Sequence, residues 1–268
     1  NQRMKVYQNF KKALQRFVQT YWGPEGRIGG RADYYVYFYL HGLALLRERG
    51  SFCFITSNSW LDVGYGADLQ RFLLTNIEIK DIYDNHAKRS FASSDINTVI
   101  VLFQRPSVGA DLSAHTARFV AFKRSFEEVL TAENLTLIEW ADSIQRTDEL
   151  RVYPLSQNEL WQAGLGSEDD TKKTMALGFG YGQYGGDKWG GKYLRAPDIF
   201  FTILEKGKGK LVRLGDIAEV RRGFTTGANE FFYLEPIVRP APDGLVHVRN
   251  GAGWEGFIEE EFLKPVVK

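Results

Sequence analysis

Residues 51–56 read Ser-Phe-Cys-Phe-Ile-Thr, and residues 97–103 read Asn-Thr-Val-Ile-Val-Leu-Phe. Short continuous apolar runs of this kind, flanked by turn residues, are typical of strands buried on both faces of a parallel sheet. Between them, Ile77, Ile79 and Ile82 alternate with polar residues, which predicts a further strand. These three strands place the chain in the α/β class.

Helical patterns lie on either side of the first strand. Residues 4–21 carry apolar side chains at helical spacing, and a second periodic stretch runs from about Ala32 to Arg49. Gly50 then gives a helix-stop signal, and a shorter helix is expected near residues 67–75. The order of elements predicts the second half of a doubly wound sheet, with an antiparallel partner at the sheet edge.

The chain changes character after residue 105. Residues 118–165 are mixed and acidic, residues 178–191 are rich in glycine, and a new β-rich unit opens near residue 211. We therefore expect three parts. They are an α/β domain at 1–108, a connecting segment with a glycine-rich loop at 109–205, and the start of another domain at 206–268.

The composition is that of a soluble globular protein, with 44% hydrophobic and 25% charged residues. No apolar run approaches the roughly 20 residues of a membrane-spanning helix, so we expect no membrane partner. One cysteine, Cys53, can form neither an internal disulfide nor a zinc cage, and its apolar surroundings predict an inert buried thiol. This cysteine usage favours a cytoplasmic location.

The net charge of +1 hides an uneven distribution. Basic residues outnumber acidic ones in residues 1–126 and 171–232, whereas residues 127–170 are strongly acidic. Separate basic blocks suit a protein that meets a polyanion on selected faces, although an ordinary solvated surface explains them equally well.

Two motif-like stretches have simpler interpretations. Residues 180–185 match G-x-G-x-x-G, but glycines and aromatic residues on both sides predict a loop rather than a phosphate-binding turn. Glu78 and Lys80, with Asp62 or Asp68 upstream, have the residue types of a Mg²⁺-dependent nuclease. Strand alternation already explains Glu78 and Lys80 as outward-facing groups, and no metal site is expected.

Two segments carry a family resemblance. Residues 32–38 read Ala-Asp-Tyr-Tyr-Val-Tyr-Phe, and residues 54–61 read Phe-Ile-Thr-Ser-Asn-Ser-Trp-Leu. This pattern resembles the gamma-class adenine-N6 DNA methyltransferases of type II and type IIG restriction–modification systems, including the TaqI-like enzymes. Further similar segments are residues 91–100, 192–197, 214–223 and 225–229.

The resemblance implies a fold for each part of the chain. Residues 1–108 would be the C-terminal half of a Rossmann-like class I methyltransferase sheet, and residues 206–268 the start of a β-rich (α+β) target-recognition domain. In the family, a cofactor loop and the catalytic Asn-Pro-Pro-Tyr precede the segment at residue 32. Neither occurs in this sequence. We therefore expect an inactive fragment and assign no catalytic residue.

The resemblance also implies a binding site. Phe91, Ser57, Asn58 and Trp60 would line the target-base pocket, and Phe38 would contact the adenine of S-adenosylmethionine. Four of these residues have a structural alternative: Phe91 and Phe38 also fit core positions, while Ser57 and Asn58 also fit a capping turn.

DNA contacts are expected from basic and hydroxyl or amide side chains in the second half of the chain. An ordinary solvated surface is the alternative for at least half of them. These residues are Lys188, Lys192, Arg195, Arg221, Arg222, Thr225, Thr226 and Asn229.

The implied activity is methyl transfer from S-adenosylmethionine to a flipped adenine in double-stranded DNA, because a stacked base cannot reach the donor. A restriction endonuclease linked to the parent protein would fit the same systems. Two other hypotheses stay open: a non-catalytic DNA-binding module and the metal-dependent nuclease.

Overall fold

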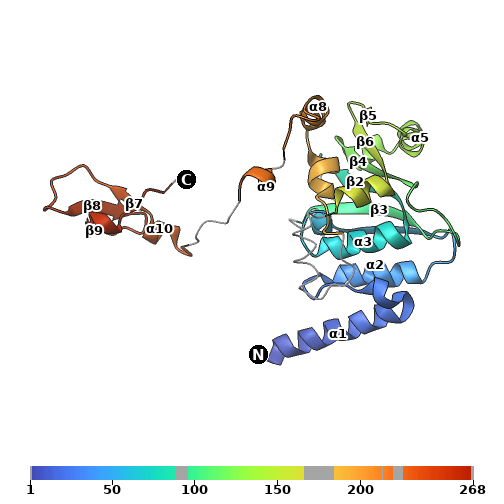
Figure 1. The fold of residues 1–268 in the computed structure, drawn as a ribbon, viewed down its shortest axis with the longest axis horizontal. Coiled ribbons are helices and arrows are strands. Elements are labelled where there is room, and N and C mark those ends of the chain that lie inside the picture. The colour runs from blue at the N-terminus through green and yellow to red at the C-terminus, as the bar shows by residue number, and fades with distance from the viewer. Residues whose placement is uncertain (1, 88–95, 166–183, 213, 220–225, 267–268) are drawn as a thin grey trace. The chain divides into compact units, whose positions relative to one another are not determined.

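The computed structural model describes residues 2–87, 96–165, 184–212, 214–219 and 226–266. It divides into two compact units, Asn1–Glu205 and Lys206–Lys268 (Figure 1). Among the described residues, no helix is both long enough and apolar enough to cross a membrane.

The first unit is built on a six-stranded mixed sheet with the order β1-β3-β2-β4-β6-β5. β2 and β4 are parallel, and the other neighbouring pairs are antiparallel. The mixed α/β class predicted from the sequence is confirmed. The strands are β1 (Ser51–Ser57), β2 (Glu78–Asn85), β3 (Thr98–Gln104), β4 (Thr116–Phe122), β5 (Gln145–Arg146) and β6 (Leu150–Ser156).

The antiparallel strand β3 lies inside the sheet, between β1 and β2. The expectation of an antiparallel partner at the sheet edge is confirmed, because the outermost strands β1 and β5 each pair antiparallel with their neighbour. The insertion of β3 makes β1 and β2 run in the same direction. Their carboxyl ends, Ser57 and Asn85, thus reach the same end of the sheet.

Three long helices precede or connect these strands: α1 (Gln2–Trp22), α2 (Tyr34–Ala44) and α3 (Gly66–Asn76). α2 and α3 lie against the sheet, and α1 lies beyond α2 (Figure 1). α2 ends about a turn before the predicted stop. Arg105 explains this end, since its guanidinium donates to the carbonyls of Ala44 at 3.1 Å and Leu46 at 2.8 Å.

The sheet does not end at residue 108, because β4, β5 and β6 continue it. Strand alternation divides β4 between two hydrophobic cores: Phe119 belongs to the large core under α2 and α3, and Phe122 to a smaller core on the opposite face. The remaining elements of this unit are η1 (Gly23–Gly26), η2 (Asn58–Leu61), α4 (Phe126–Val129), α5 (Ala132–Trp140), α6 (Gln157–Ala163), η3 (Gly190–Arg195) and α8 (Asp198–Lys206).

β1 is the outermost strand on its side of the sheet. Phe52 and Phe54 are half-buried, whereas Ser51, Cys53 and Ile55 on the opposite face are exposed. The prediction of a buried thiol was wrong, and so was the prediction of a strand buried on both faces. The physical reason is that α4 and α5 cover this face at the other end of the sheet, over β4 and β6.

The second unit contains an antiparallel sheet with the order β7-β8-β9. Among the described apolar side chains of this unit, that of Val248 in β8 is the fully buried one. Its elements are α9 (Leu214–Ile217), α10 (Asn229–Phe232), β7 (Leu234–Pro236), β8 (Leu245–Asn250), β9 (Glu255–Glu259) and η4 (Glu260–Phe262).

Candidate functional site

A crevice of about 490 Å³ opens where β1 and β2 end. Ligands in open α/β sheets commonly bind beyond the carboxyl ends of strands, and this volume falls within the roughly 300–1,000 Å³ of small-molecule sites. The lining is polar. Its residues are Asn58, Asp84, Asn85, His86, Ala87, Asn97 and Arg195.

Asn58 is the one predicted pocket residue that lines this crevice among those the structure describes. Its backbone N–H donates to the carbonyl of Asn97 at 3.0 Å, which holds the two asparagines together. Ser57 caps η2 by accepting from the N–H of Ser59 at 3.2 Å. Trp60 is fully buried against Trp189, with ring centroids 5.8 Å apart. Phe91 lies outside the described residues.

Asp84 forms the buried part of the crevice. It is 6% exposed, and one carboxylate oxygen lies 3.9 Å from Nε2 of His86. Burial raises the pKa of Asp84, while the nearby charges of His86 and Arg195 oppose that rise. Burial lowers the pKa of His86, and Asp84 acts in the opposite direction. The crevice thus contains a carboxylate with little hydration.

The polypeptide leaves β2 through a fixed turn. The side-chain amide of Asn85 donates to the carbonyl of Arg124 at 3.1 Å, and its carbonyl oxygen accepts from the N–H of Ala87 at 2.9 Å. The N–H of His86 donates to the carbonyl of Phe122 at 2.9 Å. These bonds hold Asp84 and His86 at the crevice.

Arg195 reaches the crevice from η3, a single π-helical turn. Its guanidinium is paired with the carboxylate of Asp62, which also accepts from the N–H of Gly191 at 2.8 Å. A Cβ on Gly190 would clash with the same carboxylate and with the Arg195 guanidinium, so one of these side chains would have to shift. Asp62 therefore docks η3 beside η2 and orients Arg195.

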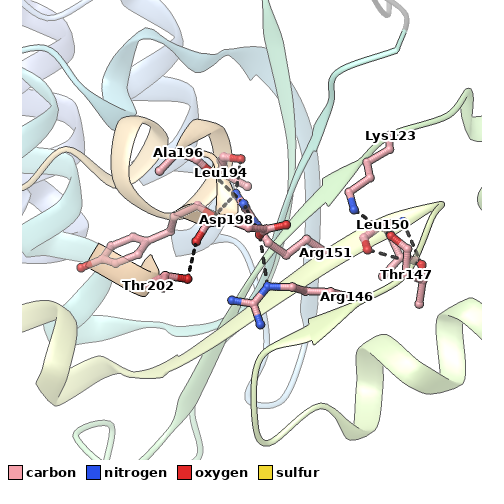
Figure 2. Close-up of polar contacts among 10 residues, drawn as sticks. Lys123, Arg146, Thr147, Leu150, Arg151, Leu194, Ala196, Asp198 and Thr202 are labelled. Carbon is pink, nitrogen blue, oxygen red and sulfur yellow. Dashed lines mark hydrogen bonds and ion pairs between the residues drawn. The ribbon is translucent and has the colours of Figure 1, made fainter. Parts of the chain in front are cut away.

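Arg151 holds the backbone immediately before and after Arg195. This arginine of β6 is buried, and its guanidinium donates to the carbonyls of Leu194 and Ala196, each at 2.7 Å. Figure 2 shows it between these carbonyls and the carboxylate of Asp198, which it meets at 3.1 Å. Arginine suits this position because its fork of donors can satisfy several buried acceptors at once.

The other predicted DNA-binding residues that the structure describes have partners within their own unit. Lys188 donates to the carbonyl of Asp62, and Lys192 pairs with Asp187. In the second unit, the hydroxyl of Thr226 donates to the side-chain oxygen of Asn229 at 2.5 Å, and both residues line a groove. Arg221, Arg222 and Thr225 lie outside the described residues.

Phe38 projects from α2 and is 61% exposed, so its alternative role as a core residue is wrong. The adjacent Tyr39 is fully buried, and its hydroxyl lies 2.8 Å from Oγ1 of Thr56. This contact fixes α2 to the carboxyl end of β1. The exposed ring of Phe38 is therefore available to a ligand or to another part of the protein.

The residues proposed for a nuclease do not assemble. Glu78 and Lys80 pair with each other at 3.1 Å, and Asp68 accepts from the N–H of Gly29 at 2.7 Å. Within the described ranges, no cluster of three or more histidine, cysteine or acidic side chains could hold a metal ion.

Sequence reasoning missed Asp84, His86 and Asn97. The run Asp84-Asn85-His86 directly after a predicted strand was a signal, because polar residues at a strand's carboxyl end mark the usual ligand edge of such sheets. No sequence signal pointed to Arg151, whose role depends on residues more than forty positions away.

Comparison with known proteins shows that part of this chain is similar to a known family. Residues 7–91 match the family model described as Eco57I restriction-modification methylase. The matched range includes Asn58 and the Asp84–Ala87 side of the crevice, and the predicted resemblance to methyltransferases is confirmed to this extent. No curated protein sequence matches the chain.

Two solved structures are similar over part of the chain. The type IIG restriction endonuclease BpuSI gives a TM-score of 0.43 and 13% identity, over 56% of this chain and 17% of that one. A DrdV–DNA complex solved by cryo-electron microscopy gives a TM-score of 0.33 and 15% identity, over 65% of this chain and 18% of that one. The chain thus spans less than a fifth of either protein.

Proposed function

We propose that this chain belongs to a gamma-class, S-adenosylmethionine-dependent DNA methyltransferase that modifies adenine N6 in a restriction–modification system. The match of residues 7–91 to a restriction–modification methylase carries the proposal. It is supported by the position of the crevice, since Asn58 and Asp84 both lie at the carboxyl ends of strands within that range.

The sheet supports the same assignment. β1, β3 and β2 would form the C-terminal part of a Rossmann-like methyltransferase sheet, in which β1 has a free edge among the described residues. Cys53 and Ile55 also leave apolar surface uncovered beside that edge. Further strands and helices of a complete catalytic domain would bury such a surface.

The residues of the chain suggest two distinct binding roles. S-adenosylmethionine, when bound, supplies an electrophilic methyl group. The exposed ring of Phe38 would hold the adenine of this cofactor. Asn58 and Phe91 would contact the flipped target base, while the buried Trp60 keeps η2 rigid. Stacking on an aromatic ring contributes roughly 1–3 kcal/mol per base.

Residues 206–268 would begin a target-recognition domain, with Thr226, Asn229 and the predicted cations Arg221 and Arg222 directed to double-stranded DNA. A linked endonuclease is part of the same proposal for the whole protein. The chain itself contains no Asn-Pro-Pro-Tyr or related tetrapeptide. We therefore propose that residues 1–268 alone do not transfer methyl groups.

The test uses labelled S-adenosylmethionine and duplex DNA. The product of the complete open reading frame that contains these residues should label adenine N6, and Asn58→Ala should lower kcat/KM at least about tenfold, as expected for the loss of a transition-state contact. Residues 1–268 alone should give no label. Labelling of cytosine, or labelling by the chain alone, would contradict the proposal.

A further inference from the structure

We infer that Asp84 is a specificity-determining residue whose carboxylate accepts a hydrogen bond from the exocyclic amino group of a nucleobase in the crevice. The inference rests on the proposed function and names the chemistry that the site selects. Adenine and cytosine present this amino group on the base edge where thymine presents an oxygen.

The first observation is the unusual position of this carboxylate. Asp84 is 6% exposed, yet it lines the crevice. The separation of 3.9 Å between its carboxylate and Nε2 of His86 is too long for a hydrogen bond. The N–H of Asn85 favours the charged form. An ionised carboxylate offers about four lone-pair positions, so it keeps acceptor capacity for a ligand.

The second observation is the chemistry of the crevice lining. Among the described residues that line the crevice, Asp84 carries the one acidic side chain. Its carboxylate favours a hydrogen-bond donor over an anionic group beside it. A metal ion is a poorer candidate, because the described residues contain no group of three ligands there. An uncharged ring with an amino group meets both conditions.

The rest of the lining suits a nucleotide. The asparagines at positions 58 and 97 carry side-chain amides, and such amides pair with base edges because they donate and accept together. Arg195 lies at the same crevice and is 40% exposed while paired with Asp62. A phosphate can take up the remaining donors of its guanidinium. Asp84 would then read the base, and Arg195 would hold the backbone.

The experiment measures binding of the 268-residue chain to single-stranded pentanucleotides by fluorescence anisotropy. Four probes differ only in the central base, which is adenine, unsubstituted purine, cytosine or thymine. Purine is adenine without its amino group. We expect the adenine probe to bind at least about tenfold more tightly than the purine probe, since hydrogen bonds to charged groups are the stronger ones. Cytosine against thymine shows whether both amino-bearing bases are accepted.

Three variants make the result specific. Asp84→Leu removes the acceptor, and the ratio of adenine to purine affinity should fall to about one, with purine affinity changed by less than about threefold. Asp84→Asn keeps an oxygen acceptor and should keep part of the ratio. The matched control Asp148→Leu changes an exposed carboxylate of the same unit and should keep the ratio intact. Circular dichroism establishes that each variant is folded.

The outcomes separate this inference from the proposed function. Equal binding of adenine and purine by the wild-type chain, or an unchanged ratio in Asp84→Leu, would overturn the role of Asp84 alone. No binding of any probe would overturn the inference, whereas the proposed function is tested separately by the labelling of adenine N6 by the complete protein.

Discussion

Two aspartates of the same strand have buried carboxylates in different surroundings. Asp81 and Asp84 of β2 are 7% and 6% exposed, but they point to opposite faces. Asp84 faces His86 and Arg195 at the crevice. Asp81 lies beside a β-bulge, and its Oδ1 has no hydrogen-bond partner among the described atoms.

The comparison indicates that burial by itself does not mark a site. Burial raises the pKa of Asp81 to about 6, and Tyr83 and Arg118 only partly offset this effect. Asp84 is also raised by burial, but its surroundings come from four separate segments that converge on an opening. A buried carboxylate is therefore a candidate binding group where charged and amide side chains converge around it, as at Asp84. Without that convergence, as at Asp81, its burial only destabilises the fold. Four predictions test this difference.

The largest effect is expected on the crevice side, at Arg151. Arg151→Met should lower the free energy of unfolding by about 3 kcal/mol or more, because it leaves the buried carbonyls of Leu194 and Ala196 without their donor. Urea unfolding measures this change. Arg146→Met removes a more exposed partner of Asp198 and should cost less than about 1 kcal/mol. Equal losses in the two variants would contradict the role of Arg151 in holding the carbonyls of Leu194 and Ala196 (Figure 2).

On the opposite face, Asp81→Asn should stabilise the protein above pH 6. The folded pKa of about 6 lies above the ordinary value of 3.8, so folding favours the protonated form. The wild-type protein should lose stability as pH rises from about 4 to 6, by up to about 3 kcal/mol, with no further loss above that range. Unfolding curves from pH 4 to 8 test this, and the Asn variant should show a smaller slope. A wild-type stability that increases over this window would refute the assignment.

A smaller effect is expected where η3 meets Asp62. In Gly190→Ala the added methyl group would displace the ends of the Asp62 and Arg195 side chains and weaken their partly exposed ion pair, at a cost of up to about 1 kcal/mol. Gly191→Ala is the matched control, because its nearest neighbour is at 3.4 Å, an ordinary contact. Thermal unfolding should separate the two variants. Similar behaviour of the two would mean that η3 does not rest on Asp62.

The smallest effect is expected at the exposed face of β1. Cys53→Ser should change the free energy of unfolding by less than about 0.5 kcal/mol, as is usual for surface substitutions. In the wild-type chain, a thiol reagent should modify Cys53 without denaturant and at a rate close to that of a free thiol. Modification that requires unfolding would show that this face is covered.

The sequence allowed the strands, the main helices and the mixed α/β class to be predicted, because apolar periodicity is a local property. It could not place β3 between β1 and β2, since strand order depends on contacts between distant segments. The exposure of Cys53 was missed for the same reason, because a continuous apolar run does not reveal which face has a cover. At the site, the family pattern predicted Asn58. Asp84 could be identified only from the structure, which places it at the same crevice as Arg195.

The most direct test of the central claim is a structure of the complete protein bound to duplex DNA and a non-reactive cofactor analogue. An extrahelical base should lie at the carboxyl ends of β1 and β2, against Asn58 and Asp84, with a neighbouring phosphate on Arg195. A duplex bound elsewhere, with this crevice filled by the protein's own side chains, would contradict the account.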